Sequence, residues 1–281
     1  MQFNIMGPFE VITDEGQTHA LKAPKICQLL AVLALQPRET VAVDTLIREL
    51  WGETPPNRAQ RTLQTHVYHA RRLLTRTHVS SPERQVLLTK SPGYRLDIDD
   101  DEVDARTFER LVRRAQQELD HDGADAASRC VTRALRLWRG RPLSNVPMGS
   151  VLTGRVARVE ELKIRALELR VETEHRLGRH REFLPDLRAL VNEYPLHEWF
   201  HGQLIWALHH SGRRRDALEA YQNLYRILKT ELGLEPSVDI QQIQAEIFRP
   251  PDRGAPRPPQ QQGGRWAYPP VTPLWAAAFA G

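Results

Sequence analysis

The side chains best suited to chemistry in this chain lie between Pro55 and Arg95, and the chemistry is electrostatic binding of a polyanion. This stretch holds eight Lys or Arg residues and one acidic residue, Glu83, whereas residues 1–54 hold four basic and seven acidic residues. The whole chain has a formal net charge of only +4. A local excess of cations on a nearly neutral chain indicates a nucleic acid as the partner.

A helix is predicted over residues 58–76, with apolar side chains at helical spacing that should face the core. These are Leu63, Val67, Ala70 and Leu74. Its polar and basic side chains fall mostly on the other side. A helix fits the DNA major groove, where Arg and short polar side chains read base edges. The candidate DNA-binding residues on this helix are Arg58, Arg61, Thr62, Thr65, His66, His69 and Arg72.

Different roles are expected within this set. Thr65 and His69 are assigned to base edges. The flanking arginines are assigned to phosphates, which position a protein on the duplex: Arg58, Arg61 and Arg72. Lys90, at the tip of a predicted hairpin, should reach the adjacent minor groove or its phosphates. Any one arginine could instead be ordinary solvated surface. These basic residues taken together favour DNA binding, because exposed helices usually carry charges of alternating sign.

The elements that must position these residues read as a winged helix-turn-helix over residues 1–98. Residues 1–22 alternate as strands do. A helix follows Pro24, and a second runs from Val43 or Asp44 to Trp51, with Asp44 as a candidate cap. Two strands, residues 85–90 and 94–98, form the wing. Trp51 is expected in the core, and Tyr94 is expected to pin the wing.

The rest of the chain is predicted to be mainly helical, so the fold class is mainly α with a small amount of β. Residues 97–104 carry six carboxylates and no base, and an acidic linker is placed at 99–104. Residues 105–249 are expected to form an all-α domain. Gly178 and Gly212 begin similar segments 34 residues apart, the period of tetratricopeptide repeats, and Gly123 begins a more divergent third. Residues 250–281, rich in Pro, Gln and Gly, are expected to be disordered.

Two other classes of protein compete with a DNA-binding protein. His197-Glu198-Trp199-Phe200-His201 matches the zinc-protease pattern, with Glu219 as a conceivable third ligand. Surface histidines on a repeat helix are the simpler interpretation. A helical-repeat adaptor would need only residues 105–248 and would leave the basic segment unexplained. We therefore expect no enzyme activity, no cofactor and no metal.

The location is expected to be the cytoplasm. Cys27 and Cys130 fit free thiols in a reducing compartment. No apolar run approaches the ~20 residues that a membrane helix needs, so no membrane partner is expected.

Several motifs together resemble the Streptomyces antibiotic regulatory protein family. Those of an OmpR-type winged helix are Asp44-x-Leu46-Ile47-x-x-Leu50-Trp51-Gly52, Arg61-x-x-x-x-His66-Val67-x-x-Ala70-Arg71-Arg72-Leu73 and Gly93-Tyr94-Arg95-Leu96. Those of a bacterial transcriptional activation domain are Val103-Asp104-x-x-x-Phe108-Glu109, Ala134-Leu135-x-Leu137-Trp138-Arg139-Gly140, Glu160-Glu161-Leu162 and Glu231-Leu232-Gly233-Leu234-Glu235-Pro236. The resemblance covers residues 1–248.

The resemblance implies a transcriptional activator specific for a secondary-metabolite (antibiotic) gene cluster. Such a protein binds direct repeats near the promoter −35 region as a side-by-side pair, a homodimer on double-stranded DNA, and recruits RNA polymerase with its sigma factor. The resemblance also implies that one exposed loop contacts polymerase or sigma: Glu53, Thr54, Pro55, Pro56 and Asn57. The protein would then be associated with the nucleoid when bound to DNA.

Overall fold

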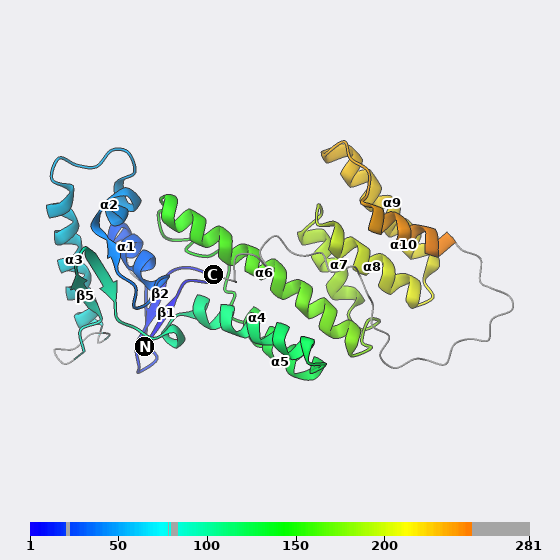
Figure 1. The fold of residues 1–281 in the computed structure, drawn as a ribbon, viewed down its shortest axis with the longest axis horizontal. Helices are drawn as coiled ribbons and strands as arrows, with labels where there is room; N and C mark the ends of the chain where they lie inside the picture. The colour runs from blue at the N-terminus through cyan, green and yellow to red at the C-terminus, as the bar shows by residue number, and fades with distance from the viewer. Residues whose placement is uncertain (21–22, 78, 80–83, 249–281) are drawn as a thin grey trace. The chain divides into compact units, whose positions relative to one another are not determined.

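The computed structural model describes residues 1–20, 23–77, 79 and 84–248 (Figure 1). Their contacts divide the chain into two compact units, Met1–Gly178 and a second that starts at Arg179. The predicted disordered tail, residues 250–281, lies outside the described residues.

The first unit begins with a small antiparallel sheet of β1 (Gln2–Asn4), β2 (Glu10–Ile12) and β3 (Thr18–Ala20), in that order. Phe3 pairs with Val11, and both side chains are buried. The alternation seen in the sequence therefore corresponds to a sheet with one face on the core.

Three helices follow: α1 (Pro24–Ala34), α2 (Val43–Trp51) and α3 (Ala59–Arg76). The apolar side chains of α1 at helical spacing, Ile26, Leu29, Leu30 and Leu33, are buried. The prediction of Asp44 as a helix cap is wrong. Ala42 occupies the cap position with no side-chain hydrogen bond, and Asp44 lies within the first turn, where a carboxylate favours the helix dipole. Trp51 is only partly buried and packs against the edge of the core.

The wing belongs to a second sheet, in the order β4-β6-β5. Its strands are β4 (Val41–Ala42), β5 (Leu87–Lys90) and β6 (Gly93–Leu96). Tyr94 pairs with Val41 on one side and with Thr89 on the other, and its side chain is buried. Tyr94 therefore pins the wing as predicted. The two-residue strand β4 was too short to give a signal in the sequence.

The acidic segment expected to be a linker is built into the first unit. A short 3-10 helix, η1 (Asp100–Glu102), is held by a capping box between Asp99 and Glu102. Val103 forms a bridge with Phe3 of β1. The contacts therefore divide the chain near Gly178 and not within residues 99–104.

Three further helices complete this unit: α4 (Asp104–Asp120), α5 (Ala124–Leu135) and α6 (Ser150–Arg176). Helices α4 and α5 form a hairpin, and α5 packs against α6 (Figure 1). Helix α6 also contacts α2 of the winged helix. The winged helix and the first helices of the downstream part thus share one core.

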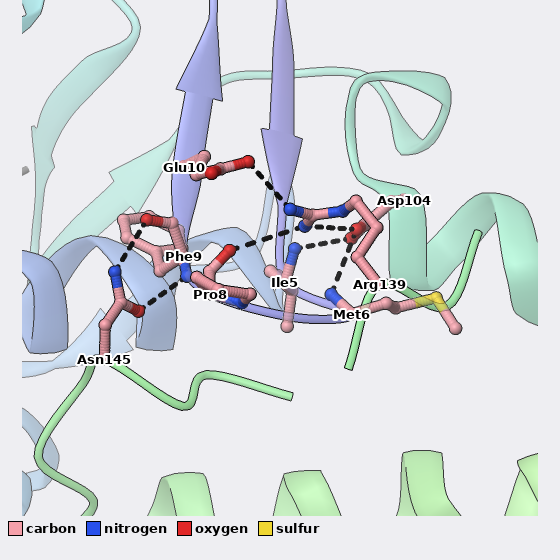
Figure 2. Close-up of polar contacts among 8 residues, drawn as sticks. All are labelled: Ile5, Met6, Pro8, Phe9, Glu10, Asp104, Arg139 and Asn145. Carbon is pink, nitrogen blue, oxygen red and sulfur yellow. Dashed lines mark hydrogen bonds and ion pairs between the residues drawn. The ribbon is translucent and has the colours of Figure 1, made fainter. Parts of the chain in front are cut away.

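Asp104 anchors the N-terminal sheet to this core (Figure 2). Its carboxylate is 2% exposed and accepts hydrogen bonds from the backbone N–H groups of Ile5, at 2.7 Å, and Met6, at 3.0 Å. Arg139 lies 3.5 Å from the same carboxylate and 2.7 Å from Glu10. Burial raises the pKa of Asp104, although these donors and Arg139 oppose that shift.

Glu49 anchors α2 to α6 in a similar way. Its carboxylate is 2% exposed and accepts hydrogen bonds from the backbone N–H groups of Gly149, at 2.7 Å, Val151, at 2.8 Å, and Leu152, at 3.3 Å. These groups belong to the N-terminus of α6, which attracts negative charge. A Cβ at position 149 would lie 2.4 Å from the Glu49 carbonyl oxygen, so only glycine permits this approach.

The second unit contains α7 (Leu184–Glu193), α8 (Glu198–His210), α9 (Arg214–Glu231) and α10 (Val238–Phe248). Helix α8 packs against α7, α9 and α10. The similarity of the segments that begin at Gly178 and Gly212 has a structural cause. Both glycines follow the end of a helix and have positive φ, 71° and 78°. In the divergent third copy Asp122 takes this conformation, one residue before Gly123.

None of the helices among the described residues is both long and apolar enough to span a bilayer. Neither cysteine forms a disulfide within the described residues: Cys27 is buried and Cys130 is partly buried. Burial raises the pKa of the Cys27 thiol, as expected for a packing residue that stays protonated.

Candidate nucleic-acid interface

Helix α3 is oriented by its apolar stripe. Leu63, Val67, Ala70 and Leu74 are all buried, as predicted. Since these residues fix one side of the helix on the core, the opposite side faces away from the protein. The helix contains no acidic residue, so the outward side is both polar and cationic.

Five of the predicted DNA-binding residues on this segment are exposed. They are Arg58, Arg61, Thr65, His69 and Arg72. Thr62 is half-buried, and its hydroxyl donates to the carbonyl oxygen of Arg58 at 3.2 Å. The Thr65 hydroxyl donates to the carbonyl oxygen of Arg61 at 3.1 Å. Each hydroxyl keeps lone pairs that can accept a hydrogen bond from a partner.

His66 lies at the edge of this face, against α2. It is half-buried, and its ring centroid is 5.9 Å from that of Trp51. Burial lowers the pKa of His66, and the nearby His69 and Lys25 lower it further. His66 is therefore suited to packing α3 on α2 as a neutral ring, and less suited to the centre of a DNA-binding face.

Two residues of α3 that were not in the predicted set lie next to it. Tyr68 is 56% exposed on the outward side. Arg71 connects α3 to the wing, because its Nε donates to the Leu87 carbonyl oxygen at 3.0 Å and its Nη2 donates to the Thr89 hydroxyl at 2.8 Å. Tyr68 could have been found from its spacing to Thr65 and Arg72, but the partners of Arg71 are 16 and 18 residues away and leave no local pattern.

The wing presents its cation to solvent. Lys90 ends β5, is exposed, and pairs in register with Gly93 of β6. Arg71 fixes the strand that carries Lys90 relative to α3. Helix α3 and the tip of the wing therefore form one surface whose two parts hold a fixed spacing.

The cations of this surface lack acidic partners. Over the described ranges, no salt bridge is formed by Arg58, Arg61, Arg72 or Lys90. Arginines on other helices are paired, such as Arg114 with Glu118 at 3.4 Å and Arg165 with Glu168 at 3.0 Å. Cations without an internal counter-charge are available to neutralise phosphates.

The loop between α2 and α3, Gly52–Asn57, is exposed throughout. Within it, the Thr54 N–H donates to the Trp51 carbonyl oxygen at 3.3 Å, and the Ala59 N–H donates to the Pro56 carbonyl oxygen at 2.9 Å. Turns at both ends and two adjacent prolines restrict its conformation. The loop is thus accessible beside α3.

The zinc-protease pattern falls on residues with structural roles. His201 is 1% exposed, so the expectation of a surface histidine is wrong here, and its Nε2 lies 3.0 Å from the Pro195 carbonyl oxygen. Glu198 accepts a hydrogen bond from the Ser237 N–H at 2.7 Å, and Glu219 lies 2.9 Å from Arg215. In the part of the chain that the structure describes, no group of three His, Cys, Asp or Glu side chains is arranged to hold a metal ion.

Comparisons with known proteins assign both parts of the chain. Residues 17–96 match the family model described as "Transcriptional regulatory protein, C terminal", and residues 103–248 match "Bacterial transcriptional activator domain". The chain is 41% identical to the regulatory protein DnrI of Streptomyces peucetius, over 92% of this chain and 97% of that one. It is 34% identical to the transcriptional regulator RedD of Streptomyces coelicolor, over 88% of this chain and 70% of that protein.

A solved structure agrees with this assignment. Mycobacterium tuberculosis EmbR, in complex with a low-affinity phosphopeptide, superimposes with a TM-score of 0.80 at 32% identity, over 89% of this chain and 66% of that chain. The motifs, the fold and the relatives lead to the same conclusion. The chain belongs to the Streptomyces antibiotic regulatory protein family of transcriptional activators, which are regulators and not enzymes.

Proposed function

We propose that this chain activates an antibiotic or other secondary-metabolite gene cluster by binding direct repeats in promoter DNA near the −35 region. Helix α3 enters the major groove, and Lys90 reaches the adjacent minor groove or its phosphates. The observation that carries the proposal is the acid-free outward side of α3, where Arg58, Arg61 and Arg72 lack salt bridges within the described residues.

The roles within this surface follow from position and chemistry. Arg58, Arg61 and Arg72 neutralise phosphates, and each neutralised phosphate adds about 1 unit to the slope of log affinity against log salt. Thr65 and His69 contact base edges, and Thr62 and His66 support the helix from its flank. Non-specific binding therefore comes from the arginines and falls steeply as salt rises.

Footprinting of the promoters beside the protein's own gene tests this proposal. The wild type is expected to protect tandem repeats upstream of −35, and Arg72→Ala is expected to lose that protection. Arg114→Ala is the matched control, because it removes an exposed helical arginine that is paired with Glu118. Equal protection by wild type and Arg72→Ala would reject α3 as the DNA-binding element.

Recruitment of RNA polymerase and its sigma factor is assigned to the exposed loop Glu53, Thr54, Pro55, Pro56 and Asn57. The loop is accessible, conformationally restricted and adjacent to α3. Replacing Pro55 and Pro56 by alanine should leave footprints unchanged and reduce transcription in vitro with purified polymerase. If both DNA binding and transcription stay intact, this assignment fails.

The protein is proposed to act as a homodimer on DNA, in the cytoplasm and in association with the nucleoid when bound. Direct repeats place two copies side by side, so binding to the second repeat should be stronger once the first is occupied. Band shifts on DNA with one or two repeats measure this. A second shifted band with no gain in affinity over the single repeat would contradict contact between the two copies.

A further inference from the structure

One exposed apolar side chain stands apart from all others in the described part of the first unit. The large apolar side chains that are exposed in the described residues are Tyr68, Leu196, Tyr225, Leu232, Leu234, Val238 and Phe248. All except Tyr68 belong to the second unit. Tyr68 is 56% exposed and lies on the polar, cationic side of α3, away from the buried stripe.

Helical spacing places Tyr68 in the middle of the outward face. Arg61, Thr65, Tyr68 and Arg72 repeat the spacing of the buried stripe, each two residues before a buried position. Two residues correspond to about 200° of helical rotation. The four side chains therefore form a line almost opposite the core, with Tyr68 between Thr65 and Arg72.

The Tyr68 ring is supported from one side. Its centroid is 5.4 Å from that of His69, with the rings at 65°, an edge-to-face arrangement. Such pairs restrict the ring orientations that are available before a partner binds. Tyr68 therefore presents a partly ordered apolar surface to whatever occupies the groove side of α3.

The major groove contains one prominent apolar group, the 5-methyl group of thymine. We infer that Tyr68 recognises a thymine within each repeat through contact of its ring with this methyl group. Arg61 and Arg72 on either side of Tyr68 hold the helix on the phosphates, while the ring adds sequence preference. The inference rests on the proposed function, because α3 must lie in the major groove for the contact to form.

Replacing thymine by deoxyuridine tests the contact, because it removes only the methyl group. Fluorescence anisotropy would measure wild-type affinity for the protected repeat with each thymine replaced in turn. At one position per repeat the affinity is expected to fall by about three- to fivefold, the effect of exposing one methyl-sized group. No loss at any thymine would overturn the inference.

Variants at position 68 identify the protein side of the contact. Tyr68→Ala should bind thymine and deoxyuridine at that position equally well. Tyr68→Phe should keep the discrimination, because it keeps the ring. Tyr225→Ala, which removes an exposed tyrosine from α9 of the second unit, is the matched control and should behave as wild type. Thermal unfolding confirms that each variant is folded.

The outcomes separate this inference from the proposed function. If Arg72→Ala binds the repeat as tightly as wild type, the DNA-binding role of α3 fails and the inference fails with it. If Arg72→Ala is impaired and Tyr68→Ala still discriminates thymine from deoxyuridine, only the inference fails. If Tyr68→Phe loses as much affinity as Tyr68→Ala and discrimination is unchanged, the hydroxyl contacts a phosphate, and the methyl contact is rejected.

Discussion

The outward face of α3 and the buried junction of the first unit use charged residues in opposite ways. On α3 the cations Arg61 and Arg72 are exposed and have no acidic partner among the described residues. At the junction the carboxylates of Glu49 and Asp104 are buried, and backbone N–H groups from distant parts of the chain surround them. Unpaired surface charge is available to a partner, whereas a buried carboxyl group that accepts hydrogen bonds from backbone N–H groups fixes elements within the protein.

This difference predicts that substitutions in the two regions have different effects. Changes at the junction should lower stability with little direct effect on the DNA-facing surface. Changes on α3 should alter DNA binding and leave stability unchanged. The two regions would be coupled if a folded junction variant changed DNA affinity, or if an α3 variant lowered stability.

The largest effect is expected for Asp104→Ala. The substitution leaves two buried N–H groups, of Ile5 and Met6, without their acceptor and removes one partner of Arg139. We expect the free energy of unfolding to fall by about 3 kcal/mol. Urea unfolding of the full chain followed by circular dichroism measures this. A loss below about 1 kcal/mol would mean that water replaces the carboxylate at little cost.

The substitution Asp104→Asn tests the raised pKa of Asp104 through the pH dependence of stability. Burial raises the folded-state pKa of Asp104 above its unfolded value, so the wild-type carboxyl is most favourable when it is protonated. Its contribution is complete below the unfolded pKa of about 3.9 and is lost as pH rises through the folded pKa. The stability of wild type minus that of Asp104→Asn should therefore grow as pH falls from 7 toward 4. A constant difference would contradict the raised pKa.

The second largest effect is expected for Glu49→Ala. Helix α6 would lose the acceptor for the N–H groups of Gly149, Val151 and Leu152, and stability should fall by about 2 kcal/mol. Glu49→Gln keeps one side-chain oxygen and should lose less. Urea unfolding measures the loss of stability in both variants. Equal losses would show that the charge itself matters at the N-terminus of α6.

These two regions also differ in how well the sequence predicts them. The exposed face of α3 follows from local periodicity, because the buried side chains from Leu63 to Leu74 recur every three to four residues and define the opposite side. Asp104 could not be interpreted this way, since its partner Ile5 lies 99 residues away. Within a run of six carboxylates it looked like part of a solvated linker. The role of Glu49 could not be predicted for the same reason, because its partners lie 100 to 103 residues away.

Within the candidate interface, the sequence predicted which side of α3 is exposed better than it predicted the surroundings of individual side chains. Periodicity placed His66 near the exposed side, but the position of α2 decides that its ring packs against Trp51. Periodicity places Tyr68 on the same side of α3 as Thr65 and Arg72, but its residue type gave no reason to select it, because a tyrosine on a helix is usually buried in part. Its exposure becomes informative only when the surrounding core is known.

Among the proposed DNA contacts, the larger effect is expected for His69→Ala. His69 is exposed, and an assigned base contact should contribute about 1–3 kcal/mol of discrimination at one base position. Affinity for the specific repeat should fall while affinity for random DNA stays the same. Binding isotherms on both DNAs measure the ratio. An equal loss on specific and random DNA would move His69 from base reading to phosphate binding.

The smallest effect is expected for Lys90→Ala at the wing. Lys90 is exposed at the end of β5, and the phosphate contact proposed for its flexible ammonium group would carry no sequence information. Affinity should therefore fall by a similar factor, about threefold, on specific and random DNA, and the salt slope should shrink by about 1 unit. Thr89→Ala removes a wing side chain without removing charge and should leave the salt slope unchanged, although it releases Arg71. If Lys90→Ala lowered affinity only for the specific repeat, the wing would be reading bases, and the division between positioning by the wing and reading by α3 would have to be abandoned.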